Sequence, residues 1–246
     1  MSITTKRIAL TFMLLCFNTV FANGQTLDHS GAKNECIILL HGLARSSSSL
    51  EKMEDVLKKT GYSVVNVDYP SRHYAIETLS RQYVSQAVKQ CHSAGANKIH
   101  FVTHSMGGIL VRYYLAHNQL SALGRVVMLS PPNKGSEIVD KLGDFPGFYA
   151  FNGPAGQQLG TTEESLPNRL KPIDCPVGII TGNRSINLIL SLLIPGDDDG
   201  KVSIENAKLA GMTDFLVVPH THPLIMRSDH VIRQTIHFLQ HAIFQK

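Results

Sequence analysis

The sequence has 246 residues, of which 43% are hydrophobic and 17% are charged, and its formal net charge at pH 7 is +4. This length suits a single domain that buries a substantial core, and the composition excludes a long disordered chain. Because lysine and arginine do not form clustered runs, the mild positive charge gives little reason to expect a nucleic-acid partner, but it leaves transient contact with an anionic membrane surface open.

The first 22 residues have the pattern of a secretory signal peptide. Lys6 and Arg7 precede an almost wholly apolar run, Ile8–Phe21, which is too short for a comfortable bilayer span. The end of this run predicts cleavage after Ala22 and export of one domain, residues 23–246, to the periplasm or the medium. An uncleaved membrane anchor is the alternative interpretation.

Removal of the leader leaves three cysteines, Cys36, Cys91 and Cys175, in a compartment that permits disulfides. At most one internal bridge can form among them, and one thiol then stays free. The sequence does not show how far apart these residues lie in the fold, so an equally good interpretation is that all three are small buried hydrophobic side chains.

Short apolar runs alternate with helical patterns along the chain, which predicts an α/β protein with a mostly parallel, doubly wound sheet and helices on both faces. Strands are expected over Cys36–Leu40, Tyr62–Val67, Lys98–Thr103, Arg125–Leu129, Val177–Thr181 and Phe215–Val218. Helices are expected over Leu50–Lys59, Ile76–His92, Gly107–His117 and Val231–Phe244. Between Pro131 and Pro172 recurring Gly and Pro predict a short loop insertion that overhangs the site at the carboxyl ends of the strands.

The strongest local motif is Thr103-His104-Ser105-Met106-Gly107-Gly108, which lies directly between a predicted strand and a predicted helix. This context is typical of a nucleophile elbow, in which Ser105 is lifted out of the sheet toward the positive end of the helix. Thr103 stands where the G-x-S-x-G pattern has its first glycine, although Thr is still a small residue. A glycine-rich turn that only packs the helix against the sheet is the alternative.

A serine hydroxyl is a weak nucleophile, so Ser105 also needs a histidine base and a carboxylate that orients the base. Downstream, the turn Asp197-Asp198-Asp199-Gly200 follows a predicted strand, as the acid of such a triad does. Asp199, directly before Gly200, is the predicted acid, and Asp198 is the second choice. A solvated turn or a weak cation site is the alternative interpretation of the acidic run.

The base is expected after the acid in the chain, and Pro219-His220-Thr221-His222-Pro223 follows the next predicted strand. Because His220 and His222 alternate, only one of them faces the site if strand geometry persists. His222 is the predicted base, since it lies on the loop that leaves the strand. With twelve histidines in the chain, an unrelated surface or core histidine is the alternative.

His41-Gly42 ends the first predicted strand, one βαβαβ stretch ahead of the Ser105 motif. The backbone N–H groups of Leu43 and Met106 are therefore expected to form an oxyanion hole for the tetrahedral intermediate. A plain turn that ends the strand is the alternative for His41-Gly42.

Other histidines carry weaker signals. His237 and His241 stand one helical turn apart, but both lie near the polar edge of an amphipathic helix, so no metal site is expected. His104 is expected to shape the site rather than act as the base, because adjacent residues on a tight turn diverge.

On these motifs the chain resembles the lipase-like α/β-hydrolases, especially small exported bacterial members related to triacylglycerol lipases and esterases. The resemblance runs through nearly all of residues 23–246 and includes Pro131-Pro132-Asn133-Lys134-Gly135-Ser136 and His222-Pro223-Leu224-Ile225-Met226. It implies the α/β-hydrolase fold, with Asp199 as the triad acid and His222 as the base. Thr103 and the short insertion depart from the pattern of the large lipases.

These motifs predict a serine hydrolase that cleaves small-molecule or lipid esters through an acyl-enzyme intermediate and requires no cofactor. Acyl transfer to an acceptor other than water, or thioester cleavage, would use the same residues. A non-catalytic binding module on the same fold is the remaining alternative, but the intact order of Ser, acid and His argues against it. The acyl chain length, the alcohol part of the substrate and the oligomeric state do not follow from the sequence.

Overall fold

The computed structural model describes residues 34–186 and 191–246. The leader expected over residues 1–22 lies outside the described residues. A six-stranded parallel sheet in the order β2-β1-β3-β4-β5-β6 forms the centre, which confirms the predicted doubly wound α/β class. Its strands are β1 (Glu35–Leu40), β2 (Ser63–Val67), β3 (Lys98–His104), β4 (Leu123–Leu129), β5 (Val177–Gly182) and β6 (Asp214–Val218).

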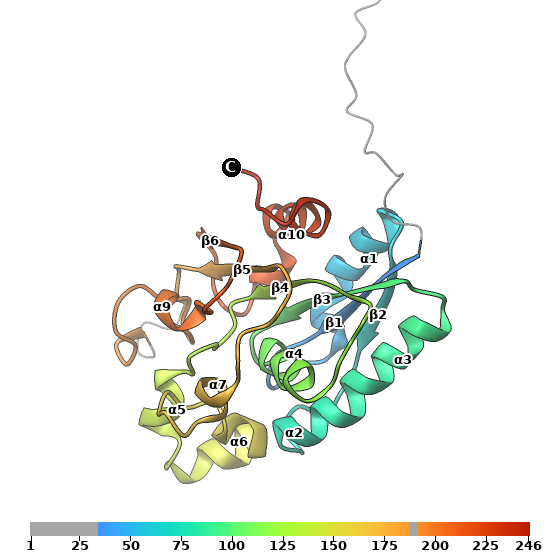
Figure 1. Cartoon of the computed structure of the whole chain (residues 1–246). Helices are drawn as coiled ribbons and strands as arrows, with labels where there is room; N and C mark the ends of the chain where they lie inside the picture. The colour runs from blue at the N-terminus through green and yellow to red at the C-terminus, as the bar shows by residue number, and fades with distance from the viewer. Residues whose placement is uncertain (1–33, 187–190) are drawn as a thin grey trace, which may run out of the picture.

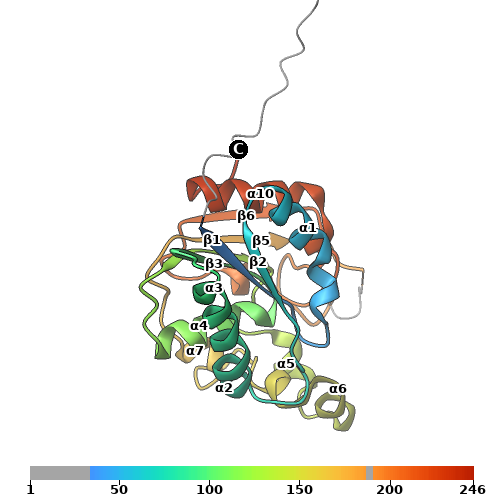
Figure 2. The same cartoon turned by 90° about the vertical axis from the view of Figure 1, so that its right-hand side faces the viewer.

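Helices cover both faces of this sheet. They are η2 (Ser47–Leu50), α1 (Glu51–Lys59), α2 (Ile76–Leu79), the π-helical turn η3 (Ser80–Val84), α3 (Ser85–Ser93), α4 (Met106–His117), η4 (Ile225–Arg227) and α10 (Asp229–His241). Figures 1 and 2 show the sheet between α1 and α10 on one side and α2, α3 and α4 on the other. The predicted coverage of both faces is therefore confirmed.

The continuous apolar run of β1 follows from this layering. Ile37 and Leu39 pack into the cluster beneath α1 and α10, whereas Ile38 and Leu40 pack into the cluster beneath α2, α3 and α4. Successive side chains of a strand point to opposite faces, so a strand covered on both sides is apolar at every position.

The segment between Pro131 and Pro172, predicted as a loop insertion, is largely helical. It contains α5 (Glu137–Leu142), α6 (Pro146–Gln157) and α7 (Leu166–Arg169), which Figure 1 shows grouped together. The Gly and Pro residues that obscured these helices have positional roles. Pro146 begins α6, where its missing N–H costs nothing, and Gly153, with φ 63°, forms a kink directly before Pro154.

Two further differences concern the carboxyl-terminal part of the chain. The short helix α9 (Ile204–Ala207) was not predicted, because four residues are too few for a helical period to show. The last helix ends at His241 rather than Phe244, since Ala242 adopts the left-handed conformation with φ 62°. No helix within the described ranges has the length and apolar character needed to cross a membrane.

Cys36 of β1 and Cys91 of α3 form a disulfide, with their Cα atoms 5.7 Å apart. Both residues are fully buried in the core between the sheet and α3. Among the described residues Cys175 is the free thiol, and burial, with the charge of Asp174, raises its pKa to about 12. The thiol therefore stays protonated and unreactive at neutral pH.

We expect the double substitution Cys36→Ser and Cys91→Ser to lower the free energy of unfolding by up to about 4 kcal/mol. The bridge joins residues 55 positions apart and restricts the unfolded chain accordingly. Urea unfolding followed by circular dichroism measures this difference, with Cys175→Ser as the matched control. An unchanged unfolding midpoint in the double variant, or an equal shift in the control, would contradict the bridge.

Candidate active site

Ser105 forms the sharp turn between β3 and α4, with φ 53° and ψ −125°. A non-glycine residue adopts such a conformation only when its surroundings enforce it, and a nucleophile elbow has this strained strand-to-helix turn. The Ser105 N–H donates to the carbonyl of Leu129 at 2.8 Å. Gly107 must lack a side chain, because a Cβ there would lie 2.5 Å from the carbonyl oxygen of Leu40. The turn thus holds Ser105 at the carboxyl edge of the sheet.

The structure brings Ser105, His222 and Asp199 together, although they are far apart in the sequence. His222 Nε2 lies 3.0 Å from Ser105 Oγ, and His222 Nδ1 lies 2.9 Å from Asp199 Oδ2. An ionised carboxylate only accepts hydrogen bonds, so Nδ1 carries the proton and Nε2 presents its lone pair to the serine hydroxyl. This arrangement can remove the serine proton during nucleophilic attack.

The environment of Asp199 keeps its carboxylate ionised. The residue is fully buried, and its Oδ1 accepts hydrogen bonds from the N–H groups of Lys201 and Val202. Burial opposes ionisation, but the charge and hydrogen bond of His222 outweigh it and lower the pKa of Asp199. Gly200 adopts φ 99°, which lets the chain turn back so that these N–H groups reach the carboxylate.

The alternative acid and base form other contacts. Asp198 Oδ1 accepts hydrogen bonds from the Gly200 N–H at 2.6 Å and from the Ser191 hydroxyl at 2.8 Å, so it shapes the turn. His220 Nε2 lies 2.8 Å from Ser228 Oγ, at the start of α10. Neither residue is hydrogen-bonded to Ser105 or to the other triad candidates among the described contacts.

His104 positions the loop that carries His222. Its Nε2–H donates to the carbonyl oxygen of His222 at 3.0 Å, because a carbonyl can only accept. Burial, followed by the charge of His222 and then those of Arg45 and Lys201, lowers the pKa of His104 well below its usual value. His104 therefore stays neutral, and it contacts the backbone of His222 rather than taking its place.

Two backbone donors lie beside Ser105. A Cβ on Gly42 would lie 3.0 Å from Ser105 Cβ, so the Gly42–Leu43 peptide is adjacent to the serine. His41 Nδ1 donates to the Gly42 carbonyl at 2.8 Å, and in a trans peptide the N–H of Leu43 points the opposite way. Among the described residues this N–H has no hydrogen-bond partner. The N–H of Met106, the first residue of α4, has no helical acceptor either.

Sequence reasoning did not assign the role of His41. The imidazole stacks on the ring of Tyr69 with centroids 3.9 Å apart, and the Tyr69 hydroxyl donates to the His41 carbonyl. Burial lowers the pKa of His41, so the ring is neutral and its single N–H is committed to Gly42. The orientation of the Leu43 donor therefore depends on a side chain whose only sequence signal is its place directly before Gly42.

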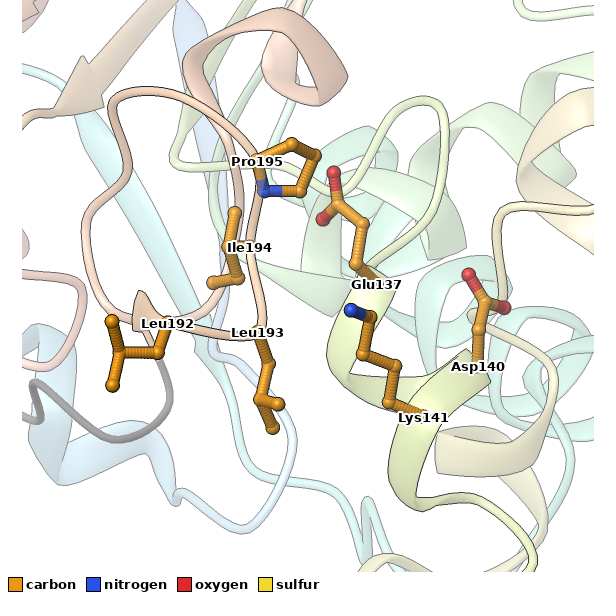
Figure 3. Close-up of a pocket in the computed structure, with 7 residues that line it drawn as sticks. All are labelled: Glu137, Asp140, Lys141, Leu192, Leu193, Ile194 and Pro195. Carbon is orange, nitrogen blue, oxygen red and sulfur yellow. The ribbon is translucent and has the colours of Figure 1, made fainter.

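Two hollows in the described part of the structure lie between loops and helices. One, of about 350 Å³, lies between the segments that follow β1 and β2 and the side chain of Phe151 on α6. The other, of about 300 Å³, lies between three charged side chains of α5 and the run Leu192–Pro195, as Figure 3 shows. Glu137 of α5 accepts a hydrogen bond from the Ser203 hydroxyl at 3.1 Å, which ties this helix to the turn after Asp199.

No group of three His, Cys, Asp or Glu in the described part of the chain is placed to hold a metal ion. His237, which the sequence pairs with His241, instead donates from Nδ1 to the carbonyl of Ile243 at 2.9 Å. The two imidazoles lie 4.5 Å apart in a tilted contact.

Comparison with known proteins identifies similar chains. The model of the alpha/beta hydrolase family matches residues 37–222, while no curated protein matches the sequence significantly. The lipase BlEst2 of Bacillus licheniformis in its mature form superimposes with a TM-score of 0.69 at 21% identity, over 82% of this chain and 91% of that one. The phospholipase PlaB of Legionella pneumophila has a TM-score of 0.62 at 17% identity, over 84% and 57% of the two chains. A metagenomic carboxyl esterase has a TM-score of 0.61 at 20% identity, over 80% and 66%.

At these identities the structural likeness establishes a shared fold and leaves chemistry to the residues of the site. The family match runs from β1 to His222, so it covers the Ser105 elbow, the turn at Asp199 and the histidine loop. The resemblance predicted from the sequence is confirmed: this chain belongs to the alpha/beta hydrolase family.

Proposed function

We propose that this protein is a serine hydrolase that cleaves carboxylic esters, with Ser105 as nucleophile, His222 as base and Asp199 as the acid that orients the base. The observation that carries this proposal is the hydrogen-bonded series from Ser105 Oγ through His222 to Asp199. The two unpaired amides beside Ser105 and the likeness to bacterial lipases and esterases support it. Small-molecule and lipid esters are the proposed substrates.

The geometry suits a two-step reaction. Ser105 Oγ attacks the ester carbonyl while His222 Nε2 takes its proton, and Asp199 stabilises the imidazolium that forms. The N–H groups of Leu43 and Met106 bind the oxygen that becomes negative. His222 then gives the proton to the departing alcohol, and a water molecule activated by the same nitrogen releases the acid from Ser105.

Two kinds of alternative remain. In one, an acyl-enzyme forms from another substrate or passes its acyl group to another acceptor; in the other, no acyl-enzyme forms. Transfer to an alcohol or cleavage of a thioester would use the same three residues, and products formed in the presence of an added alcohol distinguish transfer from hydrolysis. A non-catalytic binding module would leave Ser105 unreactive. The strained backbone at Ser105 argues against a purely binding role. Such a conformation costs free energy, and conformations of this kind are concentrated at active sites.

We expect residues 23–246 to hydrolyse p-nitrophenyl esters in a series from acetate to palmitate, and Ser105→Ala to lower kcat by at least about 10⁴-fold. A fluorophosphonate should label Ser105 in the parent protein only. Circular dichroism establishes that the variant is folded. Absence of both hydrolysis and labelling in the folded parent would contradict the proposal and favour a binding module.

Substitution of the acid tests the same proposal, and its neighbour Asp198 provides the matched control. Asp199→Asn should lower kcat by about 10³- to 10⁴-fold, because the amide no longer favours the required tautomer of His222. Asp198→Asn retains an oxygen that accepts from Gly200 and should lower kcat less than about tenfold. Equal losses in the two variants would contradict the assignment of Asp199.

We propose a transient contact between the aromatic face of α6 and a lipid surface. This face consists of Phe145 and Tyr149, four residues apart at the start of α6, which are 63% and 56% exposed. A helix with exposed aromatic side chains can insert them among lipid headgroups. The helix that carries this face packs against the segment beside Ser105, since a Cβ on Gly156 of α6 would lie 3.2 Å from a methyl group of Leu43.

We expect Phe145→Ser with Tyr149→Ser to reduce co-sedimentation with phosphatidylglycerol vesicles severalfold while hydrolysis of soluble p-nitrophenyl acetate stays within twofold. Ile243→Ser is the matched control, because this residue is 54% exposed and follows α10, which Figure 2 shows on the side of the molecule away from α6. Vesicle binding that is absent in the parent, or unchanged in the double variant, would contradict the contact.

Export with cleavage after Ala22 is likewise a proposal. A buried disulfide between Cys36 and Cys91 supports it, because such bridges persist in oxidising compartments. We expect the protein recovered from the source cells outside the cytoplasm to begin at Asn23 and to contain one disulfide by intact mass. Recovery of the full chain in the membrane fraction would instead support the uncleaved anchor.

A further inference from the structure

The hollow of about 350 Å³ beside Leu43 is lined by positive and aromatic side chains. Among the described residues, two arginines, a histidine and no carboxylate line it, and we call it the arginine pocket. Its charged and aromatic lining consists of Arg45, Arg72, His73, Tyr69 and Phe151. A concave site whose charged side chains are all positive raises the local concentration of anionic ligands.

Both arginines are free to bind an anion. Within the described ranges neither Arg45 nor Arg72 forms an ion pair with a carboxylate. The Arg72 guanidinium lies 5.7 Å from the centre of the Phe151 ring, and this cation–π contact orients it without neutralising it. A planar guanidinium binds a carboxylate or a phosphate through paired, charge-assisted hydrogen bonds.

The walls of the pocket are linked to one another. The N–H of Ala44 donates to Ser71 Oγ at 3.1 Å, which joins the segment after β1 to the segment after β2. Gly153 of α6 packs directly on the second segment, since a Cβ there would lie 1.8 Å from the Arg72 carbonyl oxygen. The backbones that carry Arg45 and Arg72 are therefore held at a defined separation, as a preorganised binding site requires.

The pocket lies within reach of a substrate bound at Ser105. Gly42 is adjacent to Ser105, and Arg45 follows Gly42 by three residues, which extend over at most about 11 Å. The charge of Arg45 is also felt beside the nucleophile, because it contributes, after burial and His222, to the lowered pKa of His104. An ester whose carbonyl lies on Ser105 can therefore place a second group in the pocket.

We propose that the arginine pocket binds an anionic group of the substrate, a carboxylate or a phosphate, a few bonds away from the ester carbonyl at Ser105. The inference rests on the proposed ester hydrolysis and narrows its substrates to esters that carry a negative charge. A neutral ester leaves both guanidinium groups without a partner, whereas an anionic ester forms hydrogen bonds with them in addition to its contacts at Ser105.

The test uses pairs of related esters in which one member carries an anionic group and the other is neutral. Mono-p-nitrophenyl succinate is compared with methyl p-nitrophenyl succinate for a carboxylate, and 1-butyrylglycerol 3-phosphate is compared with 1-butyrylglycerol for a phosphate. We expect kcat/KM of the parent protein to be about tenfold higher for the charged member of at least one pair, mainly through a lower KM. The pair that shows the preference identifies the anion.

Arg45→Gln and Arg72→Gln should each lower this charged-to-neutral ratio severalfold, and the double variant should bring it close to one. Arg233→Gln is the matched control, because Arg233 is an exposed arginine of α10 and its loss changes the net charge equally. A ratio near one in the parent, or a ratio that falls equally in the control, would overturn the proposal.

A binding measurement separates failure of the pocket from failure of the proposed function. Calorimetric titration of Ser105→Ala with succinate and with inorganic phosphate should show binding that Arg45→Gln and Arg72→Gln abolish. Anion binding without hydrolysis of any ester would retain the pocket and reject the esterase. Hydrolysis without charge preference or anion binding would do the reverse.

Discussion

The parallel direction of the strands is the constraint on which the site depends. Because all six strands run the same way, the loops that follow them emerge at one edge of the sheet. Ser105 follows β3, Gly42 follows β1, and the turns at Asp199 and His222 follow β5 and β6. The order β2-β1-β3-β4-β5-β6 then brings these four loops to the same end of the molecule. Because the strands are buried on both faces, the packed core keeps these four loops in their relative positions.

At this edge, backbone groups do much of the positioning. The carboxylate of Asp199 accepts two N–H groups of its own turn, and the backbone N–H of His222 donates to the Asp199 carbonyl at 2.8 Å. His104 holds the opposite side of the His222 backbone through the carbonyl oxygen. A neutral histidine and a neutral peptide can do this without adding charge next to the imidazole, whose own charge must change during the proposed reaction.

The region around Leu43 combines two roles in one short segment. His41 turns the Gly42–Leu43 peptide so that its N–H lies beside Ser105, and the next residues carry Arg45 into the arginine pocket. Tyr69 and Ser71, on the loop after β2, contact this segment. Helix α6 packs on both the segment around Leu43 and the loop after β2. The proposed recognition of substrate charge and the proposed oxyanion stabilisation therefore both depend on this short piece of backbone.

The sequence alone determined the layered α/β class, the six strands and the sharp turn at Ser105, because these features are local. An apolar run covered on both faces, a small-residue turn between strand and helix, and a glycine after an aspartate each leave a pattern within a few residues. The helices between Pro131 and Pro172 were missed since their Gly and Pro residues match loop composition, although Pro146 starts a helix and Gly153 forms a kink.

Tertiary structure decided between alternatives that the local patterns left open. Asp198 and Asp199 are neighbours with the same side chain, and only the fold shows that the Asp199 carboxylate meets His222, whereas Asp198 accepts hydrogen bonds from Gly200 and Ser191. The same holds for His220 and His222, for the pairing of Cys36 with Cys91, and for the approach of Arg45 to Arg72. Each of these outcomes is a distance between residues remote in the chain, and such distances are set by packing rather than by sequence period.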